Sequence, residues 1–228
     1  MMASLFWRLM PGVCVLCRSR TDRPLDLCAA CESDLPRNID PCPRCAGPTP
    51  VPGGVCPACE LAPPPYEAAV APFLYRQPLT RLIHGLKRGN GLLEARVLAH
   101  LARDPFHEAP PPDVVVPVPL TWRRRVARGY NQAALLAARI ARPSGLRVDY
   151  RSVIRVRHTP PQQSLDAAAR RRSLRGAFRC AETLAGADVA VVDDVLTTGA
   201  TAAEIARTLL AAEVRTVRVW AIARTPPT

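Results

Sequence analysis

A stretch near the carboxyl end of the chain combines the residue types that bind a phosphorylated sugar. It reads VAVVDDVLTTGAT over residues 189–201. Four apolar residues typical of a buried strand lead into Asp193 and Asp194, whose carboxylates can accept hydrogen bonds from the vicinal hydroxyls of a ribose. We expect residues 195–200 to form a short loop that opens a helix near Thr201. Hydroxyls and backbone N–H groups at a helix N-terminus suit a phosphate dianion, so the segment predicts a ribose 5-phosphate site.

Each part of this segment has an expected role. Asp193 and Asp194 are the candidate catalytic residues, because carboxylates can stabilise an oxocarbenium-like ribose. Gly199 lets the backbone approach the phosphate without a Cβ in the way. The other candidate phosphate contacts are Val195, Thr197, Thr198, Ala200 and Thr201. A strand with a polar turn and a capped helix is the structural alternative, but the order of these residues after a buried strand favours binding.

Cysteines form a second candidate site at the opposite end of the chain. Eight of the nine cysteines make four CxxC pairs, and ten residues separate each pair from the next. A CxxC turn presents two thiolates to one metal, and two such turns complete a tetrahedral site. The pattern therefore predicts two structural zinc ions. The expected ligands are Cys14, Cys17, Cys28, Cys31, Cys42, Cys45, Cys56 and Cys59.

Other chemistry fits these cysteines less well. A disulfide framework would need an oxidising compartment and a signal peptide, and the apolar stretch at residues 5–7 is too short for one. A redox CxxC would normally be single. Grouping the first four and the last four cysteines is the simpler arrangement, and an interleaved grouping stays open. Cys180 has no partner at a suitable spacing and is expected to be a core residue or a semi-exposed thiol.

A proline-rich stretch separates the cysteines from the rest of the chain. Residues 61–66 read LAPPPY, which is typical of a linker. We therefore expect a double zinc ribbon over residues 1–62 and a second domain over residues 67–228.

The second domain alternates between strand and helix character. Strands are expected at 67–75, 114–118, 147–156, 189–192 and 216–222. Helices are expected at 78–87, 91–103, 131–141 and 201–212, with a surface loop at 105–112. This alternation predicts a doubly wound parallel α/β sheet. Such sheets bind ligands beyond the carboxyl ends of their strands, which is where Asp193 and Asp194 lie.

The chain is strongly basic, with 31 basic and 19 acidic residues and a formal net charge of +12. All basic residues except Lys87 are arginines, a bias that is typical of a GC-rich genome. The excess charge still favours polyanionic partners, either phosphorylated small molecules or nucleic acid. No stretch reaches the roughly 18–20 apolar residues of a membrane span. Together with the paired thiols, this leads us to expect a cytoplasmic protein.

The segment at 189–201 closely resembles the phosphoribosyl pyrophosphate (PRPP) signature of type I phosphoribosyltransferases. With the CxxC pairs, the chain resembles the ComF family, whose members carry a zinc ribbon before such a domain. Further stretches of resemblance are VPVPLTWRRRVARGYNQ at 116–132, RxRxTPPQxxL at 155–165 and RRSLRGAF at 171–178. Ser173 stands where family members often have asparagine. The resemblance implies a type I phosphoribosyltransferase-like fold that binds PRPP with magnesium.

The resemblance also implies roles for basic residues. Residues 117–120, which include Pro119, would form the pyrophosphate loop, and Arg124 and Arg128 would hold the pyrophosphate. Residues 155–165 would be the flexible loop that closes over the site. Lys87, as the single lysine, is a candidate point charge for phosphate. Each arginine could instead belong to a solvated basic turn.

Two hypotheses about function follow. The first is a glycosyltransferase that moves phosphoribose from PRPP to an unknown acceptor, with inversion at the anomeric carbon. The second is a non-catalytic, PRPP-responsive protein that binds single-stranded DNA through its arginines, including Arg170, Arg171 and Arg172, and its zinc module. For relatives with a known role, the resemblance implies a link to natural transformation and a partner in the DNA-uptake machinery.

Overall fold

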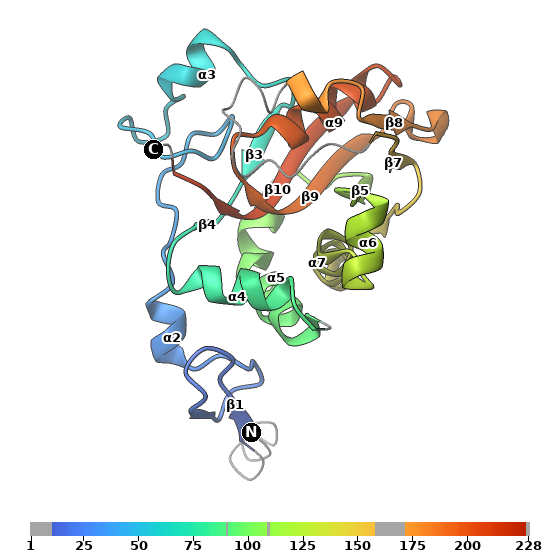
Figure 1. Ribbon diagram of the computed structural model, residues 1–228. Coiled ribbons are helices and arrows are strands. Elements are labelled where there is room, and N and C mark those ends of the chain that lie inside the picture. The colour runs from blue at the N-terminus through green and yellow to red at the C-terminus, as the bar shows by residue number, and fades with distance from the viewer. Residues whose placement is uncertain (1–10, 90, 109, 158–171, 227–228) are drawn as a thin grey trace.

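The computed structural model describes residues 11–89, 91–108, 110–157 and 172–226, and a parallel sheet lies at its centre (Figure 1). Within these ranges six strands join in the sheet, and all of their pairings are parallel. The order across the sheet is β3 (Ala68–Val70), β10 (Thr216–Arg224), β9 (Asp188–Leu196), β5 (Val114–Pro117) and β6 (Arg147–Val148). The short strand β4 (Phe73–Leu74) pairs with the carboxyl end of β10.

The chain winds in opposite directions from the two strands that flank the candidate site. From β5 it passes through α6 (Trp122–Arg128) and α7 (Gln132–Ala141) to β6 on one side. From β9 it passes through α9 (Ala200–Leu210) to β10 on the other side. Because β5 and β9 are neighbours, their carboxyl ends border the crevice in which doubly wound sheets bind ligands.

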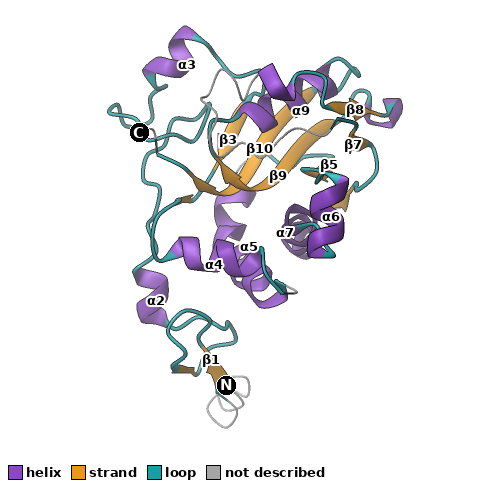
Figure 2. Ribbon diagram, viewed as in Figure 1, coloured by secondary structure: helices purple, strands orange, loops and turns teal. Residues whose placement is uncertain are grey.

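Helices cover both faces of the sheet (Figure 2). α4 (Leu79–Leu86), α5 (Leu92–His107) and α7 share one core with Val192 and Trp220. α9 shares the other core with Val191 and Val219. Neighbouring residues of β9 and β10 thus enter different cores, as the alternation of side chains along a strand requires. The predicted doubly wound parallel α/β sheet is confirmed.

Smaller elements surround the sheet. β7 (Val153–Arg155) and β8 (Phe178–Cys180) form an antiparallel pair, and β8 contacts α9. Two short 3-10 helices, η1 (Arg142–Ser144) and η3 (Glu182–Leu184), connect strands and helices. No helix in the described ranges is both long and apolar enough to cross a bilayer.

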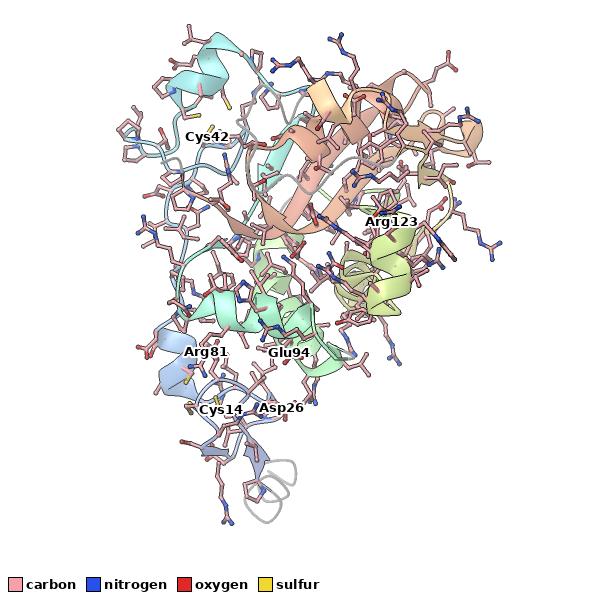
Figure 3. All side chains as sticks on the ribbon, viewed as in Figure 1. Cys14, Asp26, Cys42, Arg81, Glu94 and Arg123 are labelled. Carbon is pink, nitrogen blue, oxygen red and sulfur yellow. The ribbon has the colours of Figure 1, made fainter. Side chains whose placement is uncertain are left out.

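The cysteine-rich segment divides between the two faces of the sheet. Its first half contains β1 (Gly12–Val13), β2 (Arg20–Thr21) and α2 (Ala29–Ser33), and it contributes Leu27 to the core under α4 and α5. Its second half contains α3 (Pro57–Leu61) and contributes Ala46 to the core under α9. Figure 3 labels Cys14 and Cys42, which lie far apart at opposite ends of the molecule.

Residues 36–43 connect the two halves and form a strap along the edge of the sheet. The N–H of Leu74 in β4 donates to the carbonyl of Pro36 at 2.8 Å. The N–H of Ala69 in β3 donates to the carbonyl of Pro43 at 3.2 Å. The strap therefore occupies hydrogen-bonding positions along the β3–β4 edge.

The end of α5 differs from the prediction. Residues 105–107 belong to this helix, although the sequence predicted a surface loop over 105–112. Phe106 stacks on Trp220 with ring centroids 5.1 Å apart, and both side chains are buried. This contact holds the last helical turn on the core despite Pro105, which would otherwise disfavour a helix interior.

Other boundaries also differ. Residues 147–156 form β6 and β7 in separate sheets, because the Asp149 carboxylate accepts backbone N–H groups of Arg151 and Ser152 (2.8 and 2.9 Å) and turns the chain. The strand predicted at 189–192 continues to residue 196, which shortens the predicted loop to residues 197–199. The helix α6 was not predicted.

Candidate functional site

A cavity of about 470 Å³ opens at the carboxyl ends of β5 and β9. It brings together segments that are separated by more than a hundred residues of sequence. The residues predicted from the sequence that line it are Lys87, Pro119, Arg124, Arg128, Asp193, Asp194 and Thr201. Val118 and Leu120 of the predicted pyrophosphate loop and Arg155 of the predicted flexible loop also line it, together with Tyr75, His84 and Gln132, which were not predicted. The cavity thus has an acidic wall from β9 and a basic wall from α6.

The acidic wall is a pair of adjacent carboxylates. The backbone N–H of Asp194 donates to Oδ1 of Asp193 at 2.8 Å. Oδ2 of Asp194 forms an ion pair with Nζ of Lys87, which follows α4. Asp194 is buried, whereas Asp193 is partly exposed. The single lysine of the chain therefore contacts the acidic pair directly.

The two carboxyl groups differ in their affinity for a proton. Burial raises the pKa of Asp193 well above its usual range, and the negative charge of Asp194 raises it further. Burial also opposes ionisation of Asp194, but the Lys87 ammonium outweighs this effect and lowers the pKa of Asp194. The pair therefore favours an ionised Asp194 beside a protonated Asp193.

An Asp193→Asn variant should be more thermally stable than the wild type at neutral pH. Because the pKa of Asp193 is raised in the folded state, the folded protein binds more protons than the unfolded chain above about pH 4. The free energy of unfolding of the wild type then falls as pH rises through this range, and the asparagine removes that loss. We expect a gain of about 2–4 °C in Tm, the change that about 1 kcal/mol produces in a chain of this size.

Thermal melts of zinc-loaded protein between about pH 4 and 8 measure this difference. The matched control is Asp104→Asn, because the side chain of Asp104 is 88% exposed on α5. A Tm difference between the Asp193 variant and the wild type that stays constant with pH, or shrinks as pH rises, would contradict the assignment.

The phosphate segment lies between β9 and α9. Gly199 precedes the first residue of α9 and has φ +75°, a conformation that favours glycine. A Cβ at this position would lie 3.3 Å from the hydroxyl of Tyr66. Thr197 and Thr198 are exposed loop residues outside the cavity lining. The loop thus leads into the N-terminal turn of an eleven-residue helix, whose dipole and N–H groups favour an anion.

Two predicted phosphate contacts differ from the others in their position. Val195 lies within β9 and packs against the α4–α5 core. Ala200 is the buried first residue of α9. Neither side chain lines the cavity, so only their backbone groups remain available to a ligand.

The basic wall comes from α6. The Thr121 side chain caps this helix by accepting the N–H of Arg124 at 3.4 Å. Arg124 and Arg128 are one turn apart and both line the cavity, and Arg128 donates to Gln132 Oε1 at 2.9 Å. Asn131 caps α7 and also donates to the carbonyl of Val118 at 3.0 Å. Asn131 therefore both caps α7 and secures the loop after β5.

Several lining residues were not predicted. The hydroxyl of Tyr75 lies 3.1 Å from Nε2 of His84, and His84 is one helical turn before Lys87. This i,i+3 spacing was the available signal for His84. Arg155, by contrast, is the first residue of the predicted flexible loop, and it lies on β7 with its guanidinium 5.4 Å from the centre of the Phe178 ring. Residues 158–165 of the predicted flexible loop, and also Arg170 and Arg171, lie outside the described residues.

Tyr130 secures the turn that carries Lys87. Its hydroxyl donates to the carbonyl of Leu86 at 2.7 Å and lies 3.2 Å from the carbonyl of Arg88. These two carbonyls flank Lys87 in the sequence. The start of α7 is thereby linked to the lysine on the opposite side of the cavity.

The cysteines form two metal-binding sets in the order of the sequence. The sets are Cys14, Cys17, Cys28, Cys31 and Cys42, Cys45, Cys56, Cys59. Within each set all Sγ atoms lie within 4.8 Å of one another, as four ligands of one tetrahedral zinc require. The two Cys₄ sites support the predicted structural zinc ions and the sequential grouping. Cys180 lies on β8 outside both sets and is partly buried.

The second Cys₄ site is linked to the phosphate segment through Arg224 at the end of β10. Its Nε donates to the carbonyl of Cys45 at 3.0 Å. Its Nη1 donates to the carbonyl of Leu196 at 2.9 Å and also contacts the carbonyl of Thr197. One guanidinium therefore connects a zinc ligand with the loop that precedes α9.

Comparisons with known proteins match both parts of the chain. A family model described as the double zinc ribbon domain matches residues 5–60. The DNA utilization protein YhgH of Salmonella typhi is 40% identical over 169 residues, which cover 72% of this chain and 74% of the relative. Competence protein F of Haemophilus influenzae is 38% identical over 159 residues, which cover 66% and 69%.

A comparison with solved structures gives a weaker likeness. A structure of the allosteric regulatory enzyme of purine biosynthesis covers 56% of this chain and 24% of its own, at 21% identity and a TM-score of 0.35. A score of that size is too low to establish a common fold.

Proposed function

Because this chain belongs to the ComF family, we propose that its main cavity binds PRPP and that the protein transfers phosphoribose to an acceptor. One observation carries the proposal. Two carboxylates, two arginines and a helix N-terminus converge on a cavity of about 470 Å³, and these groups match the three parts of PRPP.

The 5-phosphate would bind at the start of α9. Hydroxyls of Thr197, Thr198 and Thr201 and the N–H groups of the first turn would be its donors. Gly199 would allow the backbone to approach the phosphate closely. Asp193 and Asp194 would then hold the ribose hydroxyls one sugar ring away.

The pyrophosphate would bind on the basic wall. Arg124 and Arg128 present planar guanidinium groups that can hold phosphate oxygens in a bidentate manner, near the loop that contains Pro119. Lys87, now paired with Asp194, would supply a further positive charge. Carboxylate and phosphate oxygens are the ligands that Mg²⁺ prefers, so the acidic pair fits a magnesium–PRPP complex.

Transfer would break the bond between C1 of the ribose and the pyrophosphate oxygen and form a bond from C1 to a nucleophilic atom of the acceptor. The electron pair of the broken bond would leave with the pyrophosphate, which the arginines stabilise. Positive charge that develops on the ribose would be stabilised by Asp194, which is ionised beside Lys87. Inversion at C1 requires the acceptor to approach from the side opposite Arg124 and Arg128.

A panel of nucleobases and amines tests the transfer step. With PRPP, magnesium and the correct acceptor, wild-type protein should release pyrophosphate, and Arg124→Ala should reduce the rate about a hundredfold, as loss of one transition-state contact does elsewhere. Arg123→Ala is the matched control, because Arg123 lies on the same helix outside the cavity lining. If the protein binds PRPP but releases no pyrophosphate with any acceptor of a broad panel, the proposed transfer is wrong and only the proposed PRPP binding stands.

Binding of single-stranded DNA is the second candidate function. It is supported by the names of the relatives, which refer to DNA utilization and competence, and by the net charge of +12. A role in DNA uptake, with a competence-machinery partner, would follow from this candidate. It requires an oligonucleotide affinity that falls steeply as salt rises. The eight thiol ligands suit a reducing cytoplasm for either function.

A further inference from the structure

A second cavity of about 470 Å³ adjoins the PRPP cavity. Its lining includes the end of β5, the residues of β7 and the segment between β6 and β7. Pro119, Leu120 and Arg155 line both cavities. Its own lining includes three aromatic side chains, Trp122, Tyr130 and Tyr150, together with Arg125. None of the described residues that line it is acidic.

The helix α6 separates the two cavities. Arg124 and Arg128 are spaced i,i+4 and face the first cavity. Trp122 and Arg125 are spaced i,i+3 and face the second. On a helix, these spacings define two separate faces. A third face carries Arg123 and Val126, which are exposed and line neither cavity.

The aromatic residues come from three separate elements. Trp122 begins α6, Tyr130 precedes α7 and Tyr150 follows β6. Trp122 is 77% exposed and Tyr150 is 55% exposed, so neither serves mainly to fill the core. Tyr130 is fixed in place by its hydrogen bond to Leu86. Two accessible rings and one ring fixed by a hydrogen bond therefore line the same cavity as the cation of Arg125.

We propose that this second cavity binds a nucleobase of single-stranded DNA, with Arg125 and Arg155 near the adjoining phosphates. The inference rests on the DNA-binding candidate and names its site. Bases stack on exposed aromatic side chains in proteins that bind single strands, and neighbouring cations follow the backbone. A base inside a duplex is already stacked and paired, so a cavity of this kind selects single strands.

The position of the cavity argues against the acceptor of the transfer reaction as its occupant. The acceptor must approach C1 from the side opposite the pyrophosphate. The second cavity is lined by the other face of α6, whose Arg124 and Arg128 would hold the pyrophosphate, and it would therefore lie on the leaving-group side.

Fluorescence anisotropy of a labelled oligo-dT of about a dozen nucleotides tests the proposal, because OB-fold single-strand sites span about 4–16 nucleotides. Trp122→Ala and Tyr150→Ala should each weaken affinity about tenfold, as loss of one stacking ring does. Trp122→Phe should retain most of the affinity, because it keeps a ring. Arg125→Ala should reduce the slope of log affinity against log salt by about one.

Variants on the third face of α6 are the matched controls. Val126→Ala and Arg123→Ala remove an apolar side chain and a charge from the same helix, and Val126→Ala should leave affinity unchanged. Arg123→Ala should change it less than Arg125→Ala does. The Asp193→Asn, Asp194→Asn double variant should retain oligonucleotide binding when PRPP is absent.

The results of this experiment distinguish failure of the DNA-binding candidate from failure of the second cavity as the DNA-binding site. If wild-type protein does not bind the oligonucleotide at low salt, the DNA-binding candidate fails and the inference fails with it. If wild type binds but Trp122→Ala and Tyr150→Ala match Val126→Ala, DNA binding stands and this cavity is the wrong site. Loss of binding in the double aspartate variant would assign the oligonucleotide to the first cavity and overturn the proposal.

Discussion

An Asp193→Asn, Asp194→Asn double variant should bind PRPP at least about a hundredfold more weakly than wild type. The reason is the loss of two acceptors for the ribose hydroxyls, the ionised carboxylate of Asp194 and the carboxyl group of Asp193, and a hydrogen bond to a charged group contributes about 1.5–3 kcal/mol. The variant also leaves Lys87 without its partner, since the ammonium now pairs with Asp194. Titration calorimetry of PRPP with magnesium measures the difference.

Two further measurements serve as controls for the loss of PRPP affinity in the double variant. Asp104→Asn, an exposed substitution on α5, should bind PRPP as wild type does. The double variant should melt lower than Asp193→Asn alone, because Asp194→Asn leaves Lys87 without its partner, so both affinities are compared at a temperature where each protein is folded. Equal PRPP affinities in wild type and the double variant would remove Asp193 and Asp194 from the site.

Substitution of cysteines should remove one zinc ion at a time. Wild-type protein should contain about two zinc ions per chain by elemental analysis, and Cys42→Ser,Cys56→Ser or Cys14→Ser,Cys28→Ser should each contain about one. Structural zinc contributes about 10–16 kcal/mol of apparent binding energy in zinc-finger peptides, so each loss should strongly destabilise its half of the segment.

The two double cysteine variants should differ in their effects on the cavity. Loss of the second site should weaken PRPP binding about tenfold or more, because Arg224 then loses its fixed contact with Cys45 and no longer holds the carbonyls of Leu196 and Thr197. Cys180→Ser is the control, since Cys180 lies outside both sets and should leave two zinc ions bound. Two zinc ions in every variant would show that the assignment of ligands is wrong.

The parts of the site that were predicted from the sequence are those that local order determines. Asp193 and Asp194 follow an apolar strand and precede a glycine and a helix, so their position at a strand end could be predicted from neighbouring residues alone. Each CxxC motif likewise places two thiolates in one turn, so the metal-binding role of the cysteines could also be predicted from neighbouring residues alone. The roles predicted for Arg124 and Arg128 came from the resemblance to a family, because a run of arginines can equally be a solvated basic turn.

The parts that were missed depend on contacts between distant segments. Trp122, Tyr130 and Tyr150 belong to or flank three different elements, and only the packing of α6, α7 and β6 places them around one cavity. The pairing of Tyr75 with His84 depends on how β4 and α4 pack together. Phe106 extends α5 past Pro105 only because Trp220 lies beneath it. In each case tertiary packing outweighs the local preference of the residues.

The strap formed by residues 36–43 has a consequence for solubility. An uncovered sheet edge offers free N–H and C=O groups to other chains and promotes aggregation. The strap covers the β3–β4 edge, and a Cys₄ site anchors it at either end, with Cys31 before it and Cys42 within it. Zinc bound at these two sites would therefore hold the strap on the edge, and depletion of the metal would expose a template for intermolecular β-pairing.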